Sequence, residues 1–285
     1  MKRRTRANWA VLLTSVPLLA VAACSASHPA AGTTVTRDHI SARLIAETRS
    51  LVPGTLSRIG LLFEIDPGWH LFGPMRNDSG LPLRVEPRAP EGFGFRSPLW
   101  PAPQRMISEG SVLDHVYRNR VTVILPLEVP VDARPGQTVT LSCRADWLVC
   151  GDACIPESAI LEITLPIGVP ADRSRPSTEA VLIRESLERI PNSIADAGNG
   201  VTQDWSDRTW SVRVADATGL AFYPDERCAP LEDPIRDAVS TNDRLRLRLA
   251  PDAGSEARIV GVLEITRPRG PNFLSIDSPR PARGT

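Results

Sequence analysis

Short runs in which apolar and polar residues alternate dominate the chain between about residues 38 and 168. Proline- and glycine-rich stretches such as Pro53-Gly54 and Pro67-Gly68 separate them. Alternation with a period of two is typical of strands with one buried face, and no long helical period interrupts the runs. This region therefore predicts an antiparallel β-sandwich. The runs lie at residues 42–52, 59–66, 81–87, 120–129, 137–147 and 159–167.

A different pattern follows at residues 169–192. Ile183, Leu187 and Ile190 form a stripe at helical spacing, Ser177 is a suitable N-cap and Pro191 ends the stripe. We expect one linking helix of about a dozen residues here. Residues 193–268 return to strand-like runs and predict a second, smaller β unit. Residues 269–285 are rich in proline, glycine and arginine, so we expect a loose C-terminal tail.

The N-terminus predicts export. Four basic residues within the first six precede an apolar stretch, residues 9–20, that is too short for a good membrane span. The sequence Val21-Ala22-Ala23-Cys24 then resembles a bacterial lipobox, so we expect a lipoprotein signal peptide at 1–23 and lipidation of Cys24. A flexible tether at 24–37 would follow. An ordinary cleavage site followed by a chance cysteine is the alternative.

Charge changes this picture little. The chain has 33 basic and 33 acidic residues, and removal of the four basic residues of the signal leaves 33 − 4 = 29 basic against 33 acidic, a net charge of −4. No basic run or face predicts nucleic-acid binding. No second apolar stretch approaches the roughly 18 residues of a membrane span. We expect a protein of the cell envelope that is held extracytoplasmically by its lipid.

The chemistry that stands out is a pair of cysteines, Cys150 and Cys154, with Gly151-Asp152-Ala153 between them. A straight strand would hold their Cα atoms about 13 Å apart, whereas a disulfide needs them within about 7 Å. Gly151-Asp152 is good turn chemistry, so a tight reversal with both sulfurs on one side is expected. A structural staple, a metal clip completed by His70 or His115, and an exchanging dithiol all remain possible functions.

Several motifs, in this order, resemble the N-terminal periplasmic domain of the DsbD family of thiol:disulfide interchange proteins, which includes copper-tolerance relatives. The resemblance implies an immunoglobulin-like sandwich over about residues 38–168 and a disulfide that cycles without an organic cofactor or a metal. It continues weakly into the second β unit. The motifs are Pro67-Gly68-Trp69-His70, 78–82, Gly92-Phe93, Trp100-Pro101-x-Pro103-x-Arg105 and 145–157.

The resemblance also implies roles for individual residues. Cys154 would form the mixed disulfide with a partner and Cys150 would resolve it. Asp152 or Glu157 is a candidate proton acceptor, although both could be plain solvated turn residues. In the family a loop covers the disulfide until a partner displaces it, and the matching stretch here is 105–117. Its apolar members are Met106, Ile107, Val112, Leu113 and Val116.

Two further cysteines leave alternatives open. Cys143 is either an inert buried thiol or a third thiol in the relay, and Cys228 has no evident partner unless the two pair with each other. The family's membrane transporter and thioredoxin-like domains do not follow in this sequence. We therefore expect a separate membrane electron transporter and extracytoplasmic thioredoxin-like proteins as partners. A copper-binding lipoprotein that uses the same two thiolates, and an adaptor that only docks partners, are the rival functions.

Overall fold

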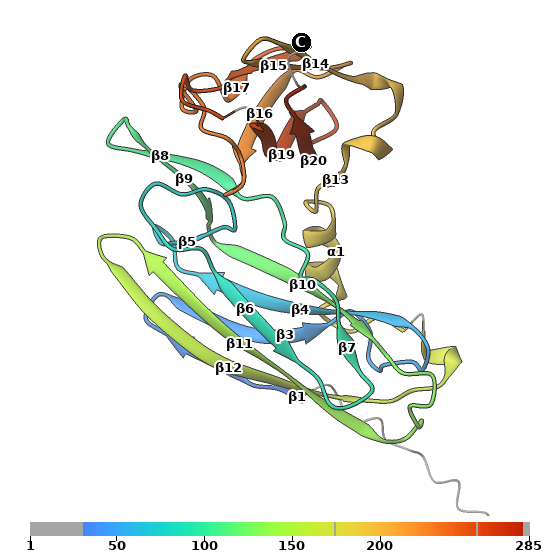
Figure 1. The fold of residues 1–285 in the computed structure, drawn as a ribbon. Helices are drawn as coiled ribbons and strands as arrows, with labels where there is room; N and C mark the ends of the chain where they lie inside the picture. The colour runs from blue at the N-terminus through green and yellow to red at the C-terminus, as the bar shows by residue number, and fades with distance from the viewer. Residues whose placement is uncertain (1–30, 174, 255, 282–285) are drawn as a thin grey trace, which may run out of the picture.

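The computed structural model describes residues 31–173, 175–254 and 256–281, and these residues form two β units joined by a helix (Figure 1). Nearly all strand pairs are antiparallel, and the first unit is a sandwich of two sheets. This confirms the predicted fold class. Among the described residues no helix is long and apolar enough to cross a membrane. The predicted signal peptide and Cys24 lie outside the described residues.

The first sheet of the sandwich contains two long strands, β11 and β12. These two strands pair along thirteen positions, and buried residues alternate with exposed ones along most of β11. The order is β1 (Ala31–Gly32), β12 (Cys154–Pro166), β11 (Thr138–Cys150), β5 (His70–Phe72), β9 (Val112–Tyr117) and β8 (Gln104–Ser108), with β6 (Arg84–Arg88) also paired to β11.

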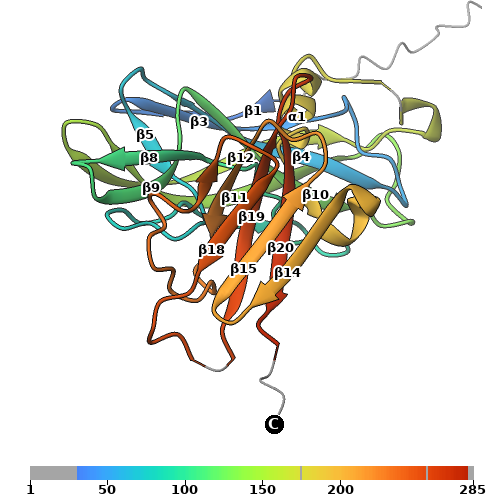
Figure 2. The same ribbon diagram turned by 90° about the horizontal axis from the view of Figure 1, so that it is seen from above.

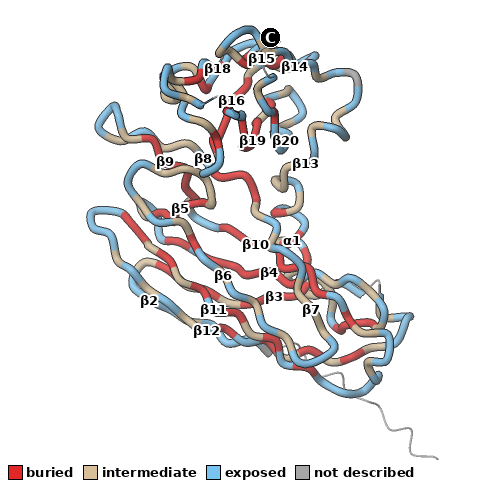
Figure 3. The backbone as a smooth tube through the Cα atoms, viewed as in Figure 1, coloured by how far each residue is buried: buried red, intermediate tan, exposed pale blue. Residues whose placement is uncertain are grey.

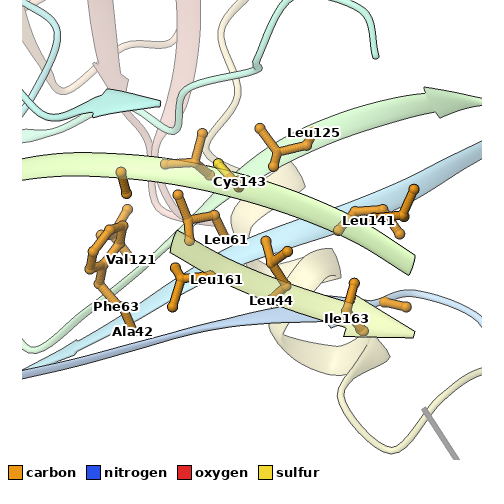
Figure 4. Close-up of a cluster of buried hydrophobic side chains, with 14 of the residues drawn as sticks. Ala42, Leu44, Leu61, Phe63, Val121, Leu125, Leu141, Cys143, Leu161 and Ile163 are labelled. Carbon is orange, nitrogen blue, oxygen red and sulfur yellow. The ribbon is translucent and has the colours of Figure 1, made fainter. Parts of the chain in front are cut away.

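The second sheet faces the first across a continuous apolar core. Its order is β2 (Thr34–Arg37), β3 (Ile40–Ala46), β4 (Leu56–Ile65), β10 (Arg120–Glu128) and β7 (Gly94–Phe95). Leu44, Leu61 and Leu125 from this sheet meet Leu141 and Ile163 from the first (Figure 4). Burial of so many aliphatic side chains is the main force that holds the two sheets together.

The linking helix covers the outer face of the second sheet. Helix α1 (Ala180–Leu187) buries Ile183 against Ile45, Leu62 and Ile124. It is shorter than expected and begins three residues after Ser177. The Ser177 hydroxyl still accepts the Glu179 N–H, but it also donates to the Ala46 carbonyl and so ties this segment to β3. Short 3-10 turns flank the helix at Pro170–Asp172, Ile194–Asp196 and Gly198–Gly200.

The second unit is a smaller two-sheet structure with its own core around Trp210 and Phe222. It lies at one end of the sandwich, beside β8 and β9 (Figures 1 and 2). One sheet has the order β13 (Asn192–Ser193), β20 (Asn272–Pro279), β19 (Arg258–Thr266), β16 (Gly219–Pro224) and β17 (Val239–Ser240); the other is β14 (Val201–Ser206), β15 (Thr209–Val214) and β18 (Arg244–Arg248).

The structure corrects two predicted boundaries. Residues 31–37, expected as tether, form β1 and β2, because Ala31-Gly32 pairs with β12 and Thr34–Arg37 forms a hairpin with β3. The tail expected to be loose contains β20, which buries Phe273 and Ile276 against the second core and the unit interface. The prediction of a loose tail followed the proline and glycine content and overlooked a short alternation of apolar residues in β20. Residues 282–285 of that tail lie outside the described part of the chain.

Candidate functional site

The two cysteines form a disulfide at the turn between β11 and β12. Cys150 ends one strand, Cys154 begins the other, and the two residues face each other in the ladder with their Cα atoms 4.2 Å apart. The Gly151 N–H donates to the Ala153 carbonyl at 3.0 Å and closes the turn. The turn and the common side of the two sulfurs were both predicted from the spacing.

The two sulfurs differ in access to solvent. Cys150 is 2% exposed, whereas Cys154 lies among the exposed residues of the turn (Figure 3). A thiolate from another protein can therefore approach the sulfur of Cys154 but not that of Cys150. This asymmetry is what an exchange reaction with a defined order of attack requires.

The cover over Cys150 comes from neighbouring strands of the same sheet. Cys150 packs in a small apolar cluster with Phe72 of β5 and Val116 of β9, and Met106 of β8 and Leu148 of β11 pack against this cluster. Strand alternation puts these side chains on the outer face of the sheet, away from the main core. These side chains therefore cover Cys150 and are not part of the sandwich core.

The predicted covering stretch, 105–117, is the β8–β9 hairpin, and it contributes unevenly. Met106 and Val116 join the disulfide cluster. Leu113 is buried, Val112 is partly exposed and Ile107 is 46% exposed. Of the five apolar candidates, Met106 and Val116 are therefore the ones that cover Cys150. The sequence alone could not distinguish these two from the other three.

A loop after β5 completes the cover over Phe72. A Cβ added at Gly80 would stand 2.1 Å from the Phe72 ring, so only glycine allows the loop to lie on it. The buried carboxylate of Asp114 accepts the backbone N–H and the hydroxyl of Ser79, at 3.0 and 2.6 Å. Asp78 in turn accepts the N–H of Leu113 at 2.7 Å. These bonds fasten the loop to β9.

Trp69 flanks the turn on its other side. A Cβ added at Gly151 would lie 2.7 Å from the indole, so the ring rests directly on the turn backbone. The ring also stacks on His39 with a centroid distance of 3.8 Å. Trp69 is only partly buried. The turn that holds the disulfide is thus fixed by an aromatic side chain at the surface.

The two candidate proton acceptors lie differently. Asp152 is exposed in the turn and makes no hydrogen bond or ion pair with another described residue. Glu157 lies three residues after Cys154, so alternation places it on the opposite face of β12. There its carboxylate is 3.6 Å from Arg37 Nε. Burial raises the pKa of Glu157, although Arg37 opposes the shift. The structure does not bring Glu157 to the Cys154 sulfur.

The other charges near the pair largely compensate each other. Arg144 donates to both carboxylate oxygens of Asp146, at 2.7 and 3.1 Å, so its positive charge is already paired. No guanidinium or ammonium contact to either sulfur is present among the described residues. A reduced thiol at Cys154 thus lacks the positive partner that usually stabilises a thiolate.

The two histidines considered as ligands are separated by the sheet. His70 faces Cys150 across the β5–β11 ladder, and burial lowers its pKa, with Arg118 acting in the same direction. His115 lies on the opposite face of β9 from Val116 and is fully buried. Within the described ranges, no group of three or more His, Cys, Asp or Glu side chains is arranged to hold a metal ion.

Both remaining described cysteines are buried free thiols. Cys143 faces the main core seven residues before Cys150, which puts it on the other side of the sheet and roughly 23 Å along the strand. Burial raises its pKa to about 11. Cys228 belongs to the core of the second unit. The structure therefore contradicts both a third exchanging thiol at Cys143 and a Cys143–Cys228 disulfide.

The second unit contacts the two covering strands, β8 and β9. Arg105 of β8 donates to the carbonyls of Pro234 and Ile235 at 2.9 and 3.1 Å. His115 of β9 packs edge-on against Tyr223, with ring centroids 5.5 Å apart. The β8–β9 hairpin is thus placed between the disulfide and the second unit.

Sequence reasoning missed Phe72 and the contacts between the units. Phe72 could have been found, because alternation through His70-Leu71-Phe72 puts it on the face of Cys150 once the β5–β11 register is known. The contact from Arg105 to Pro234 joins residues more than a hundred positions apart, and no local pattern predicts it.

Comparison with known proteins identifies the domain that contains the disulfide. Residues 41–166 match the family described as "Thiol:disulfide interchange protein DsbD, N-terminal". None of the curated proteins matches the chain. The crystal structure of the N-terminal periplasmic domain of ScsB from Proteus mirabilis is similar in fold, with a TM-score of 0.56 and 14% identity over 88% of this chain and 98% of that one.

A further structure is only distantly similar: a D312A variant of BcpA, the major pilin subunit of Bacillus cereus, has a TM-score of 0.23 and 8% identity over 90% of this chain and 74% of that one. The likeness to the ScsB domain covers so much of the chain that it includes both β units. The chain therefore contains a DsbD N-terminal-like domain of the thiol:disulfide interchange type, formed by residues 41–166.

Proposed function

We propose that the protein is a lipid-anchored, extracytoplasmic carrier of electrons that exchanges disulfides with partner proteins through Cys150 and Cys154. The observation that carries this proposal is the unequal access of the two bonded sulfurs, one exposed in a turn and one covered by an apolar cluster. Its location within a DsbD N-terminal-like domain supports the same function.

Exchange in the delivering direction begins with the reduced pair. The Cys154 thiolate attacks a partner's disulfide, a Cys154–partner bond forms, and the partner's other sulfur leaves as a thiolate. The Cys150 thiolate then attacks the Cys154 sulfur, which restores the intramolecular disulfide and releases the partner's second thiolate. Two electrons pass to the partner, which takes up two protons, while the carrier has lost the protons of its two thiols.

Recharging reverses these bonds. A thiolate of an electron donor attacks the exposed sulfur of Cys154, and Cys150 leaves as the thiolate. A second thiolate of the donor then attacks the donor sulfur that is bonded to Cys154. This forms a disulfide within the donor and releases Cys154 as a thiolate. Because no cation of the described residues contacts either sulfur, the reduced thiols ionise reluctantly, and we expect this to limit exchange with disulfides that do not dock. Asp152, exposed in the turn, is the better placed candidate to take the proton from Cys154.

Docking would occur on the face of the sheet that carries Cys154. A groove of about 500 Å³ opens there, and strand alternation puts Leu148 and Pro156 on the same face as Cys154. Leu81 lines this groove and is 68% exposed. A partner that fills the groove would have to lie against the loop over Phe72, and so could displace the cover while its own cysteine approaches Cys154.

We assign the donor role to a separate membrane electron transporter and the acceptor role to extracytoplasmic thioredoxin-like proteins. Lipid on Cys24 would hold the carrier at the membrane where such a transporter resides. These assignments follow from the resemblance to the DsbD family and from the lipobox-like sequence before Cys24.

Copper binding by the same sulfurs is the second candidate, and one observation favours it: His70 lies opposite Cys150 in the ladder between β5 and β11. A stable Cu(I) complex that needs both cysteines and His70 would support this function. An adaptor role would be supported if partners still bind and respond after both cysteines are replaced.

Two single substitutions test the order of attack. Cys150→Ser leaves Cys154 as an exposed thiol, which should form a mixed disulfide with oxidised glutathione that no internal thiol can resolve. Cys154→Ser leaves the covered Cys150, and its reaction should be at least roughly ten-fold slower, since a tenfold rate corresponds to about 1.4 kcal/mol of barrier. Intact-protein mass spectrometry follows both reactions. Equal rates for the two variants would contradict the assigned order.

A further inference from the structure

The N-terminal chain enters the fold at the end of the sandwich that lies away from the disulfide. Ala31 pairs with Thr164 and Gly32 with Ile163, so β1 runs antiparallel to β12 and its first residue lies near the Pro166 end of β12, away from Cys154. Ten residues of β12 separate Cys154 from Thr164, which is about 33 Å at roughly 3.3 Å per residue. Figure 1 shows the β11–β12 turn and the loops after β12 at opposite ends of the sandwich.

The loops at this N-terminal end lie side by side. The Leu51 N–H donates to the Pro166 carbonyl at 2.9 Å, and the Arg49 N–H donates to the Arg175 carbonyl at 3.2 Å. The Gly136 N–H likewise donates to Ile167 at 2.9 Å. The described residues of three segments, 47–58, 130–137 and 167–184 without 174, therefore form one surface, which we call the basic end.

The basic end carries more cations than anions, on a chain whose expected mature form is net negative. Its arginines outnumber its acids by six to four. Three of the four carboxylates are already engaged, by Arg58 at 3.0 Å, by Arg175 at 3.4 Å and by Arg43 of β3. The residues are Arg49, Arg58, Arg134, Arg173, Arg175 and Arg184, with Glu47, Asp132, Asp172 and Glu179.

Three of these arginines have no acidic partner. In the part of the chain that the structure describes, no carboxylate lies within ion-pair distance of Arg134, Arg173 or Arg184, and all three are exposed. The Arg49 guanidinium donates to the neutral carbonyl of Pro176, at 3.1 Å, and pairs with no described carboxylate. Exposed guanidinium groups without partners attract anions, and phosphate oxygens suit their planar donor geometry.

A hollow of about 530 Å³ lies within the basic end, between the start of β4 and the start of α1. Its charged lining consists of Glu47, Arg58, Arg173 and Arg184, and Arg58 already pairs with Glu47. The hollow therefore offers two unpaired guanidinium groups, those of Arg173 and Arg184, to a group that enters it. A phosphate of a phospholipid headgroup has the charge and size to do so.

We propose that the basic end is a docking surface for an anionic phospholipid membrane. The proposal rests on the proposed lipidation of Cys24 for the placement of this end at a membrane. Seven residues lead from Cys24 to Ala31, and they can span at most about 25 Å. Since residues 31–37 belong to strands and not to the tether, lipidated Cys24 cannot lie farther than this from Ala31, which pairs with β12 three residues before the basic end begins at residue 167.

Contact through this end would stand the sandwich on the membrane with the disulfide far from it. Cys154 would then lie about 33 Å beyond the level of Thr164. Partners outside the membrane could reach the turn freely. A membrane donor, by contrast, would have to present its cysteines well above the lipid surface or wait until the carrier tilts.

The test uses the chain from residue 24 with Cys24→Ser, so that no lipid contributes to binding. Sedimentation with vesicles of phosphatidylcholine, with and without one-third phosphatidylglycerol, measures the partition coefficient. Arg173→Glu/Arg184→Glu changes the hollow, and Arg84→Glu/Arg88→Glu on the exposed face of β6 is a control with the same change in charge. Equal circular dichroism and equal trapping of the disulfide show that both variants fold.

We expect binding to the anionic vesicles alone, weakened by salt. An arginine near such a surface contributes roughly five-fold to partitioning, so the Arg173→Glu/Arg184→Glu variant should lose more than about ten-fold. The control should change by less than about two-fold. Equal loss in both variants, or equal binding to neutral vesicles, would overturn the proposal.

A free phosphate site is distinguished in the same assay. Inorganic phosphate that releases the protein from vesicles at constant ionic strength would show an anion site in place of a membrane surface, and would also overturn the proposal. Failure of lipidation would appear separately, in the mass of Cys24 in the full chain. Failure of the exchange function would appear in the reduction potential, which the Arg173→Glu/Arg184→Glu variant should leave unchanged.

Discussion

His115 of the β8–β9 hairpin packs against the second unit. Its titration should make the free energy of unfolding depend on pH, by an amount that can be calculated. The side chain is fully buried, its Nδ1 lies 2.6 Å from the Arg76 carbonyl, and its Nε2 has no hydrogen-bond partner among the described residues. Burial lowers the pKa of His115 from 6.5 to about 4; the hydrogen bond to Arg76 opposes this shift. The nearby Arg105 lowers the pKa further, whereas Asp114 and Asp78 raise it.

The sign of the effect on stability follows from these pKa values. Because the unfolded chain binds the proton at a higher pH than the folded protein, acid favours unfolding. The contribution is complete above pH 6.5 and is lost as the pH falls towards 4. A difference of about 2.5 pKa units at 1.36 kcal/mol each amounts to roughly 3 kcal/mol.

The perturbation that isolates this contribution is His115→Asn, because an asparagine amide can still donate to the Arg76 carbonyl but does not titrate. Urea unfolding, followed by circular dichroism between pH 7 and 4, gives the free energy of unfolding of each protein. Wild type should lose about 3 kcal/mol more than His115→Asn over this range. Parallel curves for the two proteins would contradict the lowered pKa of His115.

Three further predictions concern the site. Met106→Ala should speed reduction of the disulfide by glutathione about ten-fold, as expected from about 1.4 kcal/mol of lost apolar contact, whereas Ile107→Ala should not; equal rates would show that β8 is no cover. Gly151→Ala should displace the Trp69 indole, seen as a change in fluorescence, at a cost of about 1–3 kcal/mol, and an unchanged spectrum would contradict the close contact. The Cys143 thiol, with its pKa of about 11, should react with iodoacetamide only in denaturant; labelling of the folded protein at Cys143 would show that it is accessible.

The sequence predicted the fold class and the geometry of the cysteine pair because both depend on local pattern. Alternation over 137–147 and 159–167 predicts the two strands, and the spacing of Cys150 and Cys154 requires a turn between them. The same alternation excludes a relay through Cys143, since an odd separation puts it on the other face.

The rest depends on contacts between distant segments. Composition suggested a loose tail, but Phe273 packs against Ala102 of the first unit and becomes ordered. The choice of Met106 and Val116 as cover depends on the register between β5, β9 and β11. The hydrogen bonds from Arg105 to the second unit depend on the packing of two units with separate cores. Such registers and interfaces carry no short-range sequence pattern.

The central claim, that Cys150 and Cys154 exchange with partner proteins, is tested most directly by their reduction potential. Thiol trapping in glutathione buffers, with metal excluded, measures it on the chain from residue 24 with Cys24→Ser. We expect a value in the range of exchange proteins, about −120 to −270 mV. A value below about −300 mV would mean a permanent structural disulfide and would contradict the proposed function.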